Sequence, residues 1–204
     1  MSTLSTGFVD GRLYRTCMFV YQLLVIEACL VVALLPTGAG VVLLEPDPRN
    51  ALLFAVAVIP AGPALVAGLY AVRRMEQSPV RDFVRGYRLS WLDVLKLWAP
   101  AAVVISVLSA DWLVVAGLVA LWLVNVLVIT ARFSFRIRDT ARLSAYYLGA
   151  QWRCTLNVIL LGAGFVLLVA LTSDWFAVLL LSPALYLLAR MTRPLVADVE
   201  RRFV

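Results

Sequence analysis

Histidine is absent from this chain of 204 residues, and its 18 basic residues include a single lysine, Lys96. Without imidazole the chain cannot form a Ser-His-Asp or Cys-His catalytic centre, an HExxH zinc site or a histidine ligand to haem. Charged residues are also scarce. They make up 15% of the chain, against about a quarter of a typical soluble domain. The three cysteines, Cys17, Cys29 and Cys154, are an odd number among apolar neighbours. They predict small buried side chains instead of a disulfide framework.

The apolar content is too high for one soluble core. Apolar residues make up 63% of the chain, and the mean hydropathy is +0.95. A helix needs roughly 17–25 apolar residues to cross a bilayer core about 30 Å thick. Six stretches are long enough: residues 18–35, 51–72, 92–109, 112–130, 156–172 and 175–191. The alternation of barrel strands is missing, so the sequence predicts an all-α bundle of six transmembrane helices that forms one domain over residues 1–204.

The basic residues are distributed unevenly among the connections. Arg49 is the only cation in the three connections that carry Glu45, Asp47, Asp111 and Asp174. All other basic residues lie near the termini or in the two remaining loops, so the positive-inside rule predicts that both termini are cytoplasmic. An anionic inner leaflet accounts for the net charge of +6. No basic-aromatic RNA motif or glycine-rich phosphate loop is present, so neither a nucleic-acid partner nor a cofactor is expected.

Glu27 lies near the middle of the first predicted span, where a charged carboxylate is costly unless it is paired or protonated. One interpretation is a site for a proton or a cation, or a polar contact to a partner helix. The other is a protonated glutamic acid that joins helices through hydrogen bonds. Its candidate partners for such bonds, which also lie in or near spans, are Gln22, Asn125 and Asn157.

The second predicted span contains a helix breaker. Pro60 and Pro63 flank Gly62 and remove two backbone donors, so a kink or a break is expected. A broken helix can line a substrate site. Small residues at this position also let neighbouring helices pack closely, which is the simpler interpretation.

The loop between the second and third spans predicts a short amphipathic cytoplasmic helix. Ser78 and Pro79 form a helix start, and apolar side chains then recur at helical spacing up to Trp91. Arginines occupy the opposite face. This helix would rest on the inner leaflet or dock on a protein partner. Its candidate contact residues are Phe83, Arg85, Tyr87 and Arg88.

The polar residues give little support for catalysis. No GxSxG, GxGD or DxxDG sequence occurs, and no predicted span carries two acidic residues within reach of each other. We therefore expect a protein that is not an enzyme.

Several short segments resemble the YesL-like bacterial membrane proteins, a family of unknown biochemical function. The segments are residues 60–65 (Pro-Ala-Gly-Pro-Ala-Leu), 69–73 (Leu-Tyr-Ala-Val-Arg), 79–88, 130–133 and 153–156. Two features depart from the family. Residues 26–30 read Ile-Glu-Ala-Cys-Leu, where members usually carry a sequence similar to Asn-Leu-Leu-Trp-Leu. The segment 37–50 is longer than in compact members.

The resemblance implies a role in sugar import, because genes of this family commonly accompany carbohydrate-uptake genes. We expect a multi-pass protein of the bacterial cytoplasmic membrane that acts as an accessory subunit of a carbohydrate ABC importer. Its partners would be the permease and ATPase subunits, since the chain has no Walker A sequence of its own. The alternative is a stand-alone transporter or channel for small solutes that uses Glu27 and the broken second span.

Overall fold

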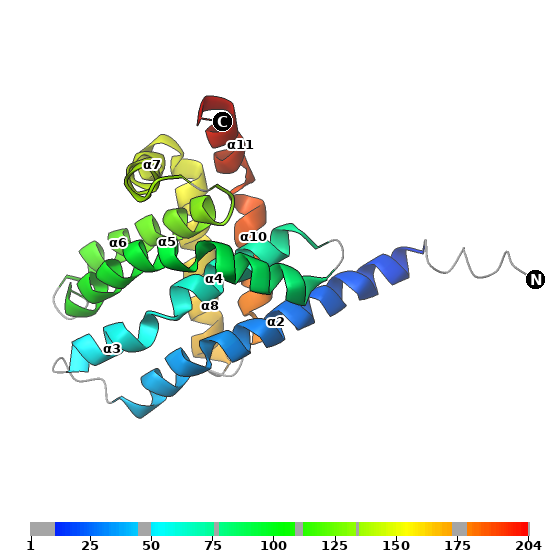
Figure 1. The fold of residues 1–204 in the computed structure, drawn as a ribbon, viewed down its shortest axis with the longest axis horizontal. Coiled ribbons are helices and arrows are strands. Elements are labelled where there is room, and N and C mark those ends of the chain that lie inside the picture. The colour runs from blue at the N-terminus through cyan, green and yellow to red at the C-terminus, as the bar shows by residue number, and fades with distance from the viewer. Residues whose placement is uncertain are drawn as a thin grey trace, which may run out of the picture.

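The computed structural model describes residues 11–44, 50–75, 78–108, 112–133, 135–172 and 179–203. Within these ranges the chain is helical and contains no strand (Figure 1), which confirms the all-α prediction. The helices are α2 (Arg12–Leu43), α3 (Ala51–Val58), α4 (Ala61–Arg73), α5 (Pro79–Leu108), α6 (Leu113–Thr130), α7 (Ile137–Ala150), α8 (Trp152–Leu171), α10 (Leu181–Met191) and α11 (Arg193–Phe203).

Four helical segments are long and apolar enough to cross a membrane: Leu13–Leu43, Ala51–Arg73, Pro79–Ser106 and Trp152–Leu171. The chain is therefore a multi-pass membrane protein. The other two predicted spans correspond to shorter helices, α6 and α10. The beginning of the last predicted span, residues 175–178, lies outside the described residues, as does Ser109 at the end of the third.

Two predicted boundaries differ from the observed ones. Helix α2 extends well beyond residues 18–35 and contains Pro36. The amphipathic segment is not a separate short helix, because α5 runs without interruption from Pro79 to Leu108. No proline or glycine lies between Arg88 and Leu92 to end the helix, and the Ser90 hydroxyl donates to the Gly86 carbonyl at 2.7 Å. The amphipathic stretch is thus the first half of the third spanning helix.

Helix α4 is the centre of the bundle and packs against α2, α5, α6 and α10. Small residues allow this close packing. A Cβ atom on Gly68 would lie 2.7 Å from Leu185 of α10 and 3.0 Å from Leu30 of α2, and one on Gly86 would lie 2.9 Å from Tyr70. Helix α8, in contrast, exposes many of its large apolar side chains, as expected of a surface in contact with lipid.

Several helix ends lie together at one end of the bundle, which we call the cation-rich end. It comprises the C-terminal ends of α4, α6 and α10, the start of α8, and helices α7 and α11. Helices α7 and α11 lie at the top of the view in Figure 1, and the N-terminal part of α2 extends away from the bundle. Trp122 of α6 donates to the Ala141 carbonyl of α7 at 3.1 Å. The Cys154 thiol at the start of α8 is 3.8 Å from the Met191 carbonyl of α10.

Candidate functional site

Glu27 accepts a hydrogen bond from the start of a helix. It is 5% exposed, and the backbone N–H of Ser182 donates to its Oε2 at 2.6 Å. Ser182 is the second residue of α10, so this N–H is one of the donors that a helix leaves unpaired at its N-terminus. The Ser182 hydroxyl in turn donates to the Leu23 carbonyl of α2 at 3.0 Å. Glu27 Oε1 is buried and has no hydrogen-bond partner among the described residues.

The other three intramembrane polar candidates do not gather around Glu27. The Gln22 amide donates to the Met75 carbonyl at 3.0 Å, just beyond the end of α4. Asn125 is buried in α6, and Asn157 is exposed on α8. Glu27 is therefore joined to the backbone of α10 and not to Gln22, Asn125 or Asn157. A polar site shared by these four residues is not formed.

The proline pair breaks the second predicted span as expected, between α3 and α4. Ala61 begins α4, with Pro60 as its N-cap residue. At the break, the Trp98 indole N–H donates to the Val58 carbonyl at 3.0 Å. A Cβ atom on Gly62 would lie 2.5 Å from the Trp98 ring. Gly62 and Pro63 are buried, so the broken segment is packed against α5, as the packing interpretation expects.

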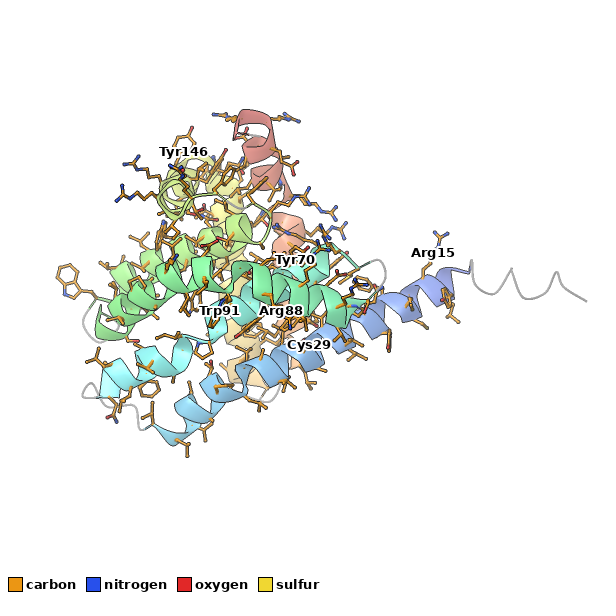
Figure 2. All side chains as sticks on the ribbon, viewed as in Figure 1. Arg15, Cys29, Tyr70, Arg88, Trp91 and Tyr146 are labelled. Carbon is orange, nitrogen blue, oxygen red and sulfur yellow. The ribbon has the colours of Figure 1, made fainter. Side chains whose placement is uncertain are left out.

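The predicted contact residues on α5 point in different directions. Phe83 is 6% exposed and belongs to the hydrophobic core, and Tyr87 packs against that core. Arg85 and Arg88 are exposed. Phe83, Tyr87 and Arg88 also line an apolar groove of about 560 Å³ between α5 and α2, with Cys29 on the opposite wall. In Figure 2 the labelled Arg88 and Cys29 lie where these two helices cross. Phe83 is thus unavailable as an exposed anchor.

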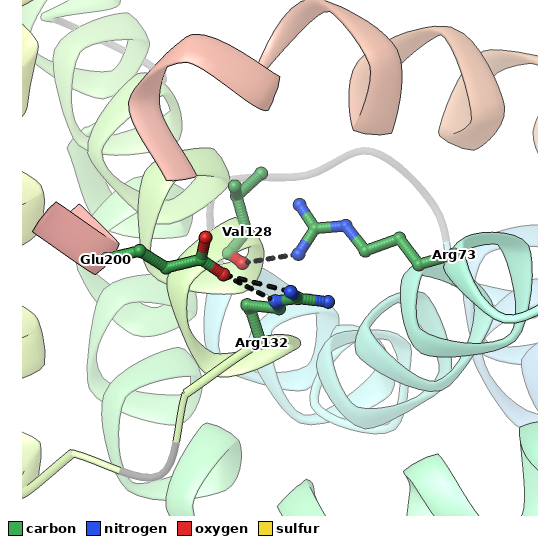
Figure 3. A network of polar contacts seen from close by, with 4 residues as sticks. All are labelled: Arg73, Val128, Arg132 and Glu200. Atoms are coloured by element: carbon green, nitrogen blue, oxygen red, sulfur yellow. Dashed lines mark hydrogen bonds and ion pairs between the residues drawn. The ribbon is translucent and has the colours of Figure 1, made fainter. Parts of the chain in front are cut away.

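A second polar site, not expected from the sequence, lies at the cation-rich end. We call it the arginine pocket, a cavity of about 310 Å³ whose charged lining residues are Arg73, Arg132, Arg190, Arg193 and Glu200. Figure 3 shows the two arginines that turn toward each other across it. Arg73 Nη1 donates to the Val128 carbonyl at 3.3 Å, and Arg132 forms an ion pair with Glu200 at 2.9 Å.

The charges in the arginine pocket are unbalanced. Four guanidinium groups face one carboxylate, which is already engaged by Arg132 through two hydrogen bonds, from Nε at 3.1 Å and from Nη2 at 2.9 Å. Arg73 Nη2 is buried and has no acceptor in the parts of the chain that the structure describes. A buried donor without an acceptor is costly. The pocket therefore carries an excess of positive charge and of hydrogen-bond donors.

The arginine pocket was not predictable from spacing along the sequence. Its lining comes from the end of α4, the residues after α6, the end of α10 and the first turns of α11. In the sequence these arginines only indicate the side of the membrane. The C-terminal segment gave one signal for the pocket. Leu195 and Val199 lie at helical spacing among charged residues, and this pattern predicts a helix that packs on the bundle.

A hydrogen bond holds α11 on α7 beside the pocket. Tyr147 is fully buried, and its hydroxyl donates to Asp198 Oδ2 at 3.0 Å. Burial of the phenol, together with the hydrogen bond to Asp198 and the negative charge of that carboxylate, raises the pKa of Tyr147 to about 12. Arg202 donates from Nε to the other oxygen of Asp198 at 3.2 Å. This arrangement fixes α11, which supplies Arg193 and Glu200 to the pocket.

Over the described ranges, no group of three histidine, cysteine or acidic side chains could hold a metal ion. In comparisons with known proteins, no family model, no curated protein and no solved structure matches this chain. The likeness to YesL-like proteins therefore stays an expectation from the sequence.

Proposed function

We propose that this chain is a non-catalytic accessory subunit of a carbohydrate ABC importer in the bacterial cytoplasmic membrane. The resemblance to YesL-like proteins suggests the system, and the use of the intramembrane polar groups supports the role. Glu27 accepts a hydrogen bond from the start of α10, and the Trp98 indole donates to the Val58 carbonyl at the break before α4. Polar groups that hold the helices together suit a subunit that assembles with partners better than a pathway for solutes.

The exposed face of the first half of α5 is the surface that we assign to the partner. Arg81, Arg85 and Arg88 are exposed there, beside the exposed apolar side chains of Val84 and Leu89. Apolar and arginine side chains together are typical of protein interfaces. Arginine also offers a planar fork of donors that lysine cannot reproduce, so a docking role depends on side-chain geometry as well as on charge.

Affinity purification from the native host in mild detergent tests this assignment. We expect the tagged protein to bring down permease and ATPase subunits. Arg85→Lys should reduce their recovery, whereas Arg138→Lys on α7, also an exposed arginine, should leave it unchanged. A chain that purifies alone from membranes containing the importer would contradict the subunit role. Equal recovery with both variants would exclude this face of α5.

One observation favours the alternative of a stand-alone transporter or channel. Glu27 Oε1 is buried and has no partner in the described parts of the chain, so it could take up a proton or a cation. Reconstitution of the purified chain in liposomes separates the two functions. Solute flux that Glu27→Gln abolishes at an equal level of protein would favour the transporter. No flux above that of empty liposomes is expected for an accessory subunit.

A further inference from the structure

The arginine pocket combines an excess of positive charge with a concave shape that is open on one side. Arg132 is paired with Glu200, whereas Arg73, Arg190 and Arg193 are not part of that ion pair. Like charges held near one another repel, and the repulsion is strongest where water is displaced. The guanidinium groups of Arg73 and Arg132 nevertheless turn toward each other in Figure 3. An anion in the pocket would relieve this repulsion.

The chemistry of the pocket favours phosphate among the common anions. Guanidinium groups bind phosphate oxygens in pairs, and several arginines around one cavity match the several oxygens of a phosphate group. The first turn of α11 adds the positive end of a helix dipole, since Arg193 is the first residue of that helix and lines the pocket. A volume of about 310 Å³ is at the lower end of the range of small-ligand sites.

The pocket lies at the ends of apolar helices, where lipid head groups lie in a bilayer. Arg73 ends a helix that is apolar enough to cross the membrane, and Arg190 lies in the last turn of α10. Basic pockets between the ends of membrane helices are known to bind anionic head groups. The same chemistry would also bind a phosphate group on a soluble molecule.

We propose that the arginine pocket binds a phosphate group, carried by an anionic phospholipid or by a phosphorylated solute. Arg73, whose Nη2 atom is buried, forms its inner wall, and the exposed Arg132, Arg190 and Arg193 form the rim around its opening. The site is separate from the face of α5 that we assign to a partner, and it does not depend on the subunit role.

The test uses the purified full-length chain with two matched double variants. Arg190→Gln with Arg193→Gln removes two charges from the rim, and these exposed residues contribute little to packing. Arg138→Gln with Arg142→Gln removes the same charge from exposed positions on α7 outside the pocket. The lipid arm counts phosphatidylglycerol, cardiolipin and phosphatidylcholine retained in native mass spectra. The solute arm follows the melting temperature, through tryptophan fluorescence, with inorganic phosphate at constant ionic strength.

For a lipid source, the wild type and the control variant should retain anionic phospholipid roughly tenfold more than phosphatidylcholine, and the rim variant should lose this preference. For a soluble source, phosphate should raise the melting temperature of the wild type and the control variant but not of the rim variant. Two outcomes would overturn the proposal: no response to either probe, or equal losses in the rim and control variants.

Discussion

At the scale of single residues, the buried carboxyl group of Glu27 is explained by its partner. A helix N-terminus carries a partial positive charge and unpaired N–H groups, both of which favour a carboxylate. The N–H of Ser182 is such a group and lies 2.6 Å from Glu27 Oε2, although the two residues are 155 positions apart in the sequence. Glu27 thus joins α2 to α10 and has a structural role through its Oε2 atom.

Substitutions of Glu27 should separate hydrogen bonding from charge. Glu27→Gln keeps an oxygen that can accept from the Ser182 N–H, so the melting temperature in detergent should change little. Glu27→Leu leaves that buried donor unpaired and should cost about 1–3 kcal/mol. Asn157→Leu, at an exposed position on α8, serves as the control and should be neutral. If the glutamine and leucine variants had the same melting temperature, the hydrogen bond would not be the stabilising element.

The bond between Tyr147 and Asp198 should make the docking of α11 sensitive to alkaline pH. The pKa of Tyr147 is raised from its ordinary value near 10 to about 12 in the folded protein. A raised pKa means that the folded state holds the proton more tightly than the unfolded state. The contribution is therefore fully present below pH 10 and is lost as the pH rises through 12.

Tyr147→Phe should cost about 1 kcal/mol at pH 8, because it removes the hydrogen bond. The difference in stability between wild type and variant should shrink as the pH rises from 10 to 12, because the variant has no phenol to ionise. Unfolding followed by circular dichroism across this range measures the effect. Tyr146→Phe, at an exposed position beside it, should behave like the wild type. A difference that stays constant with pH would be inconsistent with this explanation.

At the scale of helices, the starts of α4 and α10 share a sequence pattern. Pro63-Ala64-Leu65 lies in the first turns of α4, and Pro183-Ala184-Leu185 lies in the first turns of α10. A side chain from another helix forms a hydrogen bond at each of these helix starts. Trp98 of α5 donates to the carbonyl just before α4, and Glu27 of α2 accepts from the start of α10. Side chains from other helices thus bond backbone groups at the starts of α4 and α10.

Gly62 should be intolerant of even a methyl group. In Gly62→Ala the new Cβ would lie 2.5–2.9 Å from atoms of the Trp98 ring, so the indole must move and its bond to Val58 weakens. We expect a loss of about 1–3 kcal/mol. Gly164→Ala on α8, where a Cβ meets no atom within 4 Å, should be neutral or stabilising by up to about 1 kcal/mol. Thermal unfolding of both variants in one detergent measures the contrast, and similar melting temperatures would contradict it.

At the scale of the whole molecule, the fold brings the ends of α4, α6 and α10 together at one end of the bundle, with α7 and α11 around them. The charged lining of the arginine pocket comes from this end. The grouping agrees with the uneven distribution of cations along the sequence.

Labelling from the two sides of the membrane tests the orientation. Single cysteines in a variant without the three native ones should react from outside at positions 47, 111 and 174, and only from inside at positions 85, 138 and 202. The positive-inside rule gives these sides. Expression level and detergent extraction of each variant serve as controls for insertion. Any position that reacts from the opposite side would require a different number of spans.

Much of the fold was predictable because its causes are local. Long apolar runs predicted membrane helices, and four segments of adequate length and hydropathy are present. Pro60 and Pro63 predicted the break, because a proline lacks the donor that a continuous helix needs. The separate amphipathic helix was wrong for a related reason. A change of composition from polar to apolar near Leu92 does not end a helix unless a breaker accompanies it, so α5 continues to Leu108.

The sequence by itself determined that this is an all-helical membrane protein, because the transfer of apolar side chains out of water depends on composition along the chain. Tertiary structure alone decided which polar groups meet. It placed Glu27 on the N–H of Ser182, buried Phe83 in the core, and gathered arginines from four separate segments around one pocket. These pairings depend on how helices cross and rotate against one another, and small residues such as Gly62 and Gly68 set the distances at which they do so.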